Sequence, residues 1–160
     1  MIRYANRNDL SRIAEIYVYS NRLNYYPIFK DEEYSFKYLS VENIIKEYFS
    51  KEEIIKRTLV YDDGIIRGFM EIDGQEIVKF YVDSFFKGKG IGKRMMNYAL
   101  SHFDIKYLWA LEKNQDALGF YQKMGFKISD ERKLEEGTSE YLLKLIYQET
   151  SKKEAVIIES

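Results

Sequence analysis

Residues 80–96 hold the feature that most constrains this chain: three glycines at alternate positions, Gly88, Gly90 and Gly92, between a strand-like and a helix-like run. Glycine has no Cβ, so such a loop lets backbone N–H groups approach a ligand closely. The helix that follows points its positive dipole end toward the same place. The pattern therefore predicts a phosphate or pyrophosphate site, although on its own it also fits a glycine-rich connector without a ligand.

Two common phosphate-binding loops do not fit this stretch. A P-loop needs a glycine five residues before Gly92 and Ser or Thr after Lys93, and the chain has Lys87 and Arg94 at these positions. The dinucleotide fingerprint, started at Gly88, requires a third glycine where Lys93 stands. Both nucleotide-binding motifs are therefore excluded.

Composition excludes several further classes of function. The 25 basic and 26 acidic side chains give a formal net charge of -1, which argues against a nucleic-acid partner. The chain has no cysteine and a single histidine, His102, so we expect no disulfide, no thiolate nucleophile and no metal site. No apolar run is long enough to span a bilayer, and the first residues lack the apolar region of a signal peptide. We therefore expect a cytoplasmic protein without a membrane partner.

Hydrophobic periodicity indicates an α/β chain. Its 160 residues suit one domain, expected over 1–147, followed by a mobile tail over 148–160. Helices are expected over about 10–21, 41–56 and 90–103, and a fourth is opened by Asn114 and ended by a left-handed Gly125. Strands are expected over residues 2–4, 58–61, 65–72, 76–82, 107–111, 126–130 and 140–147.

A second motif, N-Q-D-A-L-G-F-Y-Q-K-M-G-F, runs from Asn114 to Phe126. Together with K-G-K-G-I-G at 87–92, it resembles the two signature motifs of the GCN5-related N-acetyltransferase (GNAT) family, in the family's order. Every named position of the family's N-x-x-A-x-x-F-Y-x-K-x-G-F pattern matches. The first motif departs from the family at Lys87, where Gln or Arg is usual, and the lysine lacks the fork geometry of Arg. The resemblance covers about residues 1–147.

The resemblance implies both a fold and a cosubstrate. The fold would be α/β, with a mixed, mostly antiparallel central sheet of about seven strands flanked by about four helices. The cosubstrate would be acetyl-CoA, with its pyrophosphate on the loop amides and its pantetheine arm along exposed strand edges. The residues implied to contact it are Tyr81, Val82, Lys87, Gly88, Lys89, Gly90, Ile91, Gly92, Lys93, Asn114 and Tyr121.

The acceptor site is expected in the aromatic segment 22–41, because in the family this segment covers the acceptor and varies with the substrate. Tyr25, Tyr26 and Phe29 are the pocket candidates, although they fit equally well as cover for a sheet edge. The acidic run 31–33 suits a cationic amine, or it is only solvated surface. We expect a small cationic amine as acceptor, with a protein N-terminus or lysine as the alternative, and either a monomer or a homodimer.

Acetyl transfer to an amine requires a general base, oxyanion stabilisation and a general acid near sulfur. By the family match Tyr121 is the acid, because a phenol with a pKa of about 10 is protonated at neutral pH. Glu71 ranks first as base, ahead of Glu76 and Glu112, and an ordered water would replace it. If 73–74 form the hairpin loop, Glu71 faces Glu76, which is either a local repulsion or an acid–base site with a raised pKa. A non-catalytic acyl-CoA-binding domain is the alternative function.

Overall fold

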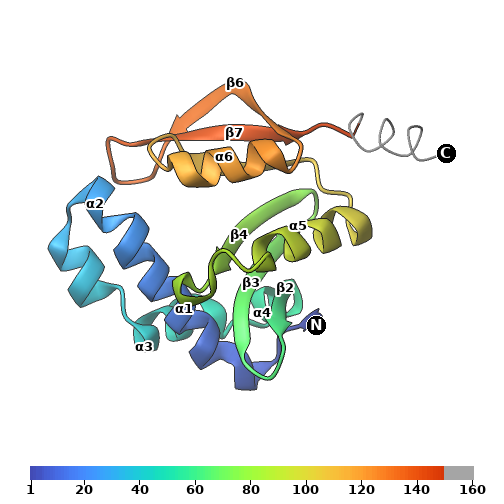
Figure 1. The fold of residues 1–160 in the computed structure, drawn as a ribbon. Coiled ribbons are helices and arrows are strands. Elements are labelled where there is room, and N and C mark those ends of the chain that lie inside the picture. The colour runs from blue at the N-terminus through green and yellow to red at the C-terminus, as the bar shows by residue number, and fades with distance from the viewer. Residues whose placement is uncertain (150–160) are drawn as a thin grey trace. The chain divides into compact units, whose positions relative to one another are not determined.

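The computed structural model describes residues 1–149. The predicted tail, 148–160, falls mostly on residues 150–160, which lie outside the described residues. The described chain has seven strands and six α-helical segments, and the predicted α/β class with about seven mostly antiparallel strands is confirmed (Figure 1). These elements form two compact units, one of Met1–Asp73 with Ile77–His102, the other of Gly74–Glu76 with the chain from Phe103 onward. The single-domain organisation stays a prediction.

The first unit is built on four strands in the order β1, β2, β3, β4. The β1–β2 and β2–β3 pairs are antiparallel, and Thr58 of β2 lies opposite Glu71 of β3. The strands are β1 Ile2–Tyr4, β2 Thr58–Asp62, β3 Ile66–Asp73 and β4 Glu76–Val82. The helices are α1 Leu10–Asn24, α2 Tyr26–Phe29, α3 Val41–Ile44, α4 Glu52–Lys56 and α5 Ile91–His102.

Helices α1 and α5 cover opposite faces of β3. The helical spacing of apolar residues in α1 buries Ile13 against a core that includes Val60 and Phe69. Neighbouring residues of a strand point to opposite faces, so Gly68 belongs to the other face. There a Cβ added to Gly68 would lie 2.8 Å from the Tyr81 carbonyl oxygen and 3.2 Å from Met95 Sδ of α5. The missing side chain therefore allows α5 and β4 to approach β3 closely.

The segment expected as one helix over 41–56 is broken in the structure. Helix α3 leads into a π-helical turn, Ile45–Phe49, and α4 begins only after Ser50 and Lys51. A π turn admits an extra residue and shifts the side chains that follow around the axis. Here Phe49 lies in the core, only 1% exposed, while its neighbour Tyr48 reaches a polar partner on β3. The continuous helix was therefore a wrong prediction.

The hairpin between β3 and β4 also differs from the prediction. Strand β3 extends to Asp73, and the two loop residues are Gly74 and Gln75, one position later than expected. Gly74 has a φ of +61°, a left-handed conformation that glycine adopts at little cost. With this loop Glu71 is not opposite Glu76, so the predicted pair of facing carboxylates is wrong.

The second unit holds β5 Tyr107–Leu111, β6 Phe126–Leu134, β7 Tyr141–Tyr147 and α6 Gln115–Lys123. Strand β7 lies between β5 and β6 and is antiparallel to both. As predicted, Asn114 opens α6 and Gly125 ends it with a φ of +100°. Strand β6 runs four residues further than expected, to Leu134, and its register with β7 shifts between Ile128 and Arg132. No helix in residues 1–149 has the length and apolar character needed to cross a membrane.

Candidate active site

The glycine-rich loop joins β4 to α5 through a short 3-10 turn, Ser84–Phe86 (Figure 1). Gly88 and Gly90 have φ values of +81° and +78°, so both need the left-handed backbone that other residues rarely adopt. The amide of Arg94 donates to the Gly90 carbonyl at 3.0 Å and makes the first turn of α5. The N–H groups at the three positions before Arg94 therefore lack an acceptor within the helix. They form a set of donors at the positive end of α5.

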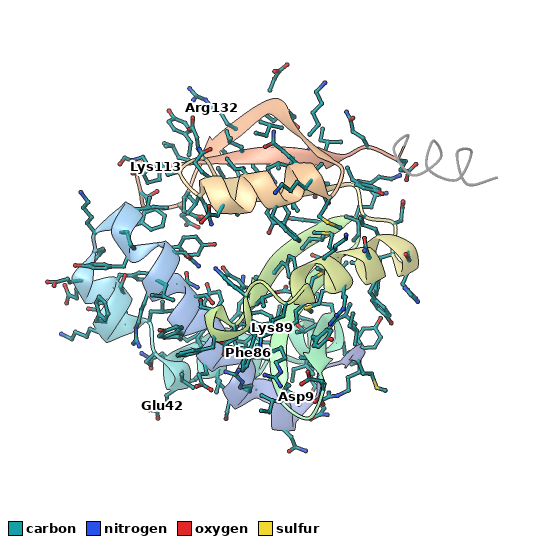
Figure 2. All side chains as sticks on the ribbon, viewed as in Figure 1. Asp9, Glu42, Phe86, Lys89, Lys113 and Arg132 are labelled. Atoms are coloured by element: carbon teal, nitrogen blue, oxygen red, sulfur yellow. The ribbon has the colours of Figure 1, made fainter. Side chains whose placement is uncertain are left out.

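The space around this loop is open, and its charge is positive. A Cβ added at Gly88 or at Gly90 would meet no atom of the described chain within 4 Å. Lys87, Lys89 and Lys93 are exposed, and Figure 2 shows Lys89 beside Phe86, with the ammonium 5.8 Å from the ring centroid. Backbone donors with several cations around them suit a pyrophosphate.

Two other residues implied in cofactor binding contribute in different ways. Ile91 is 5% exposed, so its side chain belongs to the core and only its backbone is available to a ligand. Val82 ends β4 and is half-buried. The loop and the strand end therefore offer mainly backbone groups.

Tyr25 and Tyr81, predicted for the acceptor and the cofactor respectively, come together in the first unit. Their hydroxyl oxygens lie 3.5 Å apart. The ring of Tyr81 stacks on Phe69 with 5.4 Å between centroids, and its edge contact with Tyr17 of α1 is at 5.3 Å. This packing holds one face of β4 against α1 and leaves Tyr81 half-buried.

The other predicted acceptor residues pack differently. Phe29 lies against Tyr25 with 6.4 Å between ring centroids. Tyr26 instead makes an edge contact at 5.0 Å with Phe36, whose ring also lies 5.5 Å from the Arg22 guanidinium. Tyr26 therefore supports the segment that contains Phe36, and only Tyr25 is joined to β4.

Lys79 extends the aromatic surface along β4. Residues 79 and 81 share a face of the strand, so alternation along the strand predicts that they lie together. The Lys79 ammonium lies 4.2 Å from the ring centroid of Tyr48 and 5.7 Å from that of Tyr17.

Glu71, predicted as general base, is fully buried in an ion pair. Its carboxylate accepts from Arg57 Nε at 2.8 Å and lies 2.7 Å from Arg57 Nη2. The Tyr48 hydroxyl lies 2.6 and 2.8 Å from its two oxygens. Burial, together with the hydrogen bond to Glu71, raises the pKa of Tyr48 above its usual range. A carboxylate with 0% exposure and these partners cannot receive an amine directly, so the geometry favours a structural role over the predicted one of base.

Asn114 and Tyr121 lie on α6 in the second unit. The Asn114 side-chain oxygen accepts from the Ala117 amide at 3.2 Å, which makes it the N-cap of this helix. The Tyr121 ring makes edge contacts with Phe120 at 5.6 Å and Phe126 at 6.0 Å, and the residue is half-buried. These contacts fix the ring. Within residues 1–149, no three His, Cys, Asp or Glu side chains are grouped to hold a metal ion.

Arg12 and Asp83 form an ion pair beside the loop that the sequence analysis missed. Arg12 Nη2 lies 2.6 Å from Asp83 Oδ2, although the two residues are 71 positions apart. Asp83 could have been found as an N-cap before the turn at 84–86, because Asp is favoured there. No local pattern points to Arg12.

Comparison with known proteins places the chain among characterised relatives. Residues 54–128 match the family model described as acetyltransferase (GNAT) domain. This match spans just under half of the chain, and it agrees with the resemblance to the GNAT family that the two motifs predict. The predicted resemblance and the predicted class of enzyme, an N-acetyltransferase, are therefore confirmed.

Curated relatives of this chain carry two kinds of name. The peptidyl-lysine N-acetyltransferase YjaB of Salmonella typhimurium is 29% identical over 67% of this chain and 73% of its own. YiaC of Escherichia coli, with the same description, is 29% identical over 81% of this chain and 85% of its own length. The spermine/spermidine N(1)-acetyltransferase of Bacillus subtilis is 31% identical over 44% of this chain and 47% of its own length.

Solved structures agree with the fold. The apo form of YjaB from Escherichia coli superposes with a TM-score of 0.67 at 24% identity, covering 92% of this chain and 96% of that one. The PaiA N-acetyltransferase from Thermoplasma acidophilum, solved in complex with coenzyme A, gives the same TM-score and identity. The match covers 92% of this chain and 98% of that one. These likenesses confirm the predicted GNAT-like architecture.

Proposed function

We propose that this protein transfers the acetyl group of acetyl-CoA to the primary amine of a cationic acceptor. The observation that carries the proposal is the loop itself. Gly88 and Gly90 both adopt the left-handed backbone, and a Cβ added at either position would meet open space. The amides that open α5 lack an acceptor within the helix. This chain therefore retains the backbone geometry that a pyrophosphate needs.

In this proposal the loop amides from Gly88 to Lys93 bind the pyrophosphate. Lys87, Lys89 and Lys93 add positive charge around it, and one or two of them are sufficient. Acetyl-CoA, when bound, supplies the acetyl thioester. The contribution of the first unit is to hold and orient the cosubstrate.

Tyr121 is the proposed general acid. Its hydroxyl oxygen carries the proton that the departing thiolate sulfur takes up, which prevents the reverse attack. The ring contacts with Phe120 and Phe126 support this role, because a fixed phenol needs no reorganisation when the proton moves. Glu71 takes no part in proton transfer here. Solvent accepts the proton that the ammonium loses before attack, and the second proton, which leaves the nitrogen after the C–N bond forms, restores the Tyr121 phenol through solvent.

The acceptor is proposed to be cationic, because the relatives are named as acetyltransferases of peptidyl-lysine and of spermine or spermidine, which are all cationic amines. Exposed Asp31, Glu32 and Glu33 support this assignment. Nearby aromatic side chains are also accessible, with Tyr34 50%, Phe36 54% and Tyr38 58% exposed. Carboxylates and aromatic faces together attract ammonium groups, the first by charge and the second through the ring quadrupole.

A calorimetric titration with acetyl-CoA, beside ATP and NAD, tests the cosubstrate. We expect binding in the micromolar range for acetyl-CoA alone. A CoA-release assay with spermine and with a lysine peptide blocked at its N-terminus then identifies the acceptor. Failure to bind acetyl-CoA would overturn the proposal. Binding without release of CoA to any amine would instead indicate a non-catalytic acyl-CoA-binding domain.

A further inference from the structure

We propose that Arg12 and Asp83 act as a positioning pair that holds the glycine loop in its ligand-binding conformation. Neither residue needs to touch a ligand for this role. The inference rests on the proposed function of the loop, but its first readout, the order of the loop in the free protein, does not depend on that function.

The two oxygens of Asp83 have separate partners. Oδ2 lies 2.6 Å from Arg12 Nη2, which ties it to α1, and Oδ1 accepts from the Phe85 amide at 2.9 Å. The second bond caps the turn that leads into the loop. The side chains of Arg12 and Asp83 are only 24% and 9% exposed, so the pair is shielded more than an ordinary surface ion pair. One carboxylate therefore links the first helix to the start of the loop.

Strand β3 supplies the second attachment of the same segment. The Asp83 amide donates to the Arg67 carbonyl at 2.8 Å, and Arg12 Nε donates to the Ile66 carbonyl at 3.1 Å. The Arg67 guanidinium lies 4.0 Å from the ring centroid of Phe86. The chain is thus held from α1 and from β3 up to Phe86, two residues before the first left-handed glycine.

The fixed segment matters because it leads directly into the two left-handed glycines. Gly88 and Gly90 have more conformations available than other residues, and ordering them on ligand binding costs free energy. A fixed entry restricts those conformations in advance, and such preorganisation raises affinity without adding a ligand contact. Loss of the pair should therefore weaken acetyl-CoA binding while the chemical step remains intact.

The role requires arginine at position 12. Its Nε and Nη2 donate to two different acceptors, the Ile66 carbonyl and Asp83. A lysine carries one nitrogen and cannot reproduce both directions. Arg12→Lys should keep the charge but restore only part of the function that Arg12→Met loses.

Hydrogen exchange of the ligand-free protein is the first measurement. We expect Arg12→Met and Asp83→Asn to raise exchange of the Phe85, Phe86 and Lys87 amides, which donate within the turn, by about tenfold or more. Arg12→Lys should lie between these variants and the wild type. Arg3→Met is the matched control, because Arg3 forms comparable ion pairs with Asp9 and Asp62 in the same unit, at 2.8 and 2.9 Å. It should leave exchange of the three turn amides unchanged.

Steady-state kinetics are the second measurement. Arg12→Met should raise KM for acetyl-CoA by about tenfold with kcat within about twofold, and Arg3→Met should change neither. Unchanged loop exchange in folded Arg12→Lys and Asp83→Asn proteins would overturn the proposal, as would an equal fall in kcat and kcat/KM. If the wild type fails to bind acetyl-CoA while loop exchange still rises in the variants, the proposed function fails and the positioning pair stands.

Discussion

The hydroxyl oxygen of Tyr48 lies 2.6 Å from one carboxylate oxygen of Glu71 and 2.8 Å from the other. Arg57 pairs with the same carboxylate. It lies at the end of segment 45–57, which begins with the π turn. A fully buried carboxylate on β3 therefore joins two ends of the irregular segment 45–57 to the sheet. The π turn is part of this arrangement, because it directs Tyr48 to Glu71 while Phe49 enters the core.

Replacing Arg57, the cation that pairs with buried Glu71, should destabilise the protein strongly. Arg57→Met leaves the Glu71 charge buried without its partner, and we expect the free energy of unfolding to fall by about 3–5 kcal/mol. Urea denaturation measures this free energy of unfolding. Arg7→Met is the matched control, because the Arg7–Glu52 pair is 61% and 60% exposed. That variant should lose at most about 1 kcal/mol, and equal losses in the two variants would contradict the argument.

Neutralising Glu71 tests its role in catalysis. Glu71→Gln should lower stability, because the amide has one accepting oxygen in place of two and loses the charge that pairs with Arg57. The pH dependence of kcat/KM should keep the position of its acidic limb, since solvent takes the proton of the amine in the proposed mechanism. A lost acidic limb with kcat/KM lower by about a hundredfold or more would restore Glu71 as the general base.

The parts of the fold that the sequence could predict depend on local geometry. Gly125 was expected to end its helix in a left-handed conformation, and its φ is +100°. Asn114 was expected to open α6, and its side chain caps that helix. Such features involve residues within a few positions of one another, so their spacing in the sequence contains the necessary information.

The missed features depend on partners distant in the sequence. Arg12 meets Asp83 only because α1 and the end of β4 flank the same strand, and Arg57 meets Glu71 through the β2–β3 pairing. The hairpin shift by one residue is instead a choice between two adjacent local turns. Asp-Gly is a good two-residue turn, but the alternative Gly74-Gln75 turn extends β3 by one residue.

A matched pair of glycine variants separates binding from strain. Gly90 and Gly137 have φ values of +78° and +75°, and a Cβ added at either position meets no described atom within 4 Å. Valine at either position should therefore cost a similar amount of stability, about 1–2 kcal/mol. Only Gly90→Val should abolish acetyl-CoA binding in calorimetry, because its side chain fills the space proposed for pyrophosphate. Normal binding by folded Gly90→Val would make the loop a connector only.

Stability should depend on pH through Asp9. The hydrogen bond from Arg3 lowers the pKa of Asp9 despite its burial. The folded state then binds the proton more weakly than the unfolded state, so this contribution is present above the unfolded pKa and is lost as pH falls below about 4. Asp9→Asn should flatten that part of the profile of unfolding free energy against pH. Arg3→Met should flatten it too, and an unchanged slope in Arg3→Met would contradict the assignment.

The role of Tyr121 is tested by removing its hydroxyl alone. Tyr121→Phe keeps the ring and its contacts with Phe120 and Phe126, so the fold and the affinity for acetyl-CoA should change little. Turnover, measured as CoA release with the accepted amine, should fall by at least about tenfold, because the leaving thiolate loses its proton donor. The fall should appear in kcat and in kcat/KM alike.

Tyr141→Phe is the matched control for this substitution. Tyr141 lies on β7 in the same unit, and its ring, which phenylalanine preserves, lies 4.2 Å from the Arg132 guanidinium. Turnover of this variant should equal that of the wild type. If Tyr121→Phe also turns over at the wild-type rate, the phenol is not the acid, and its match to the family motif reflects the packing of α6 on Phe126 rather than chemistry.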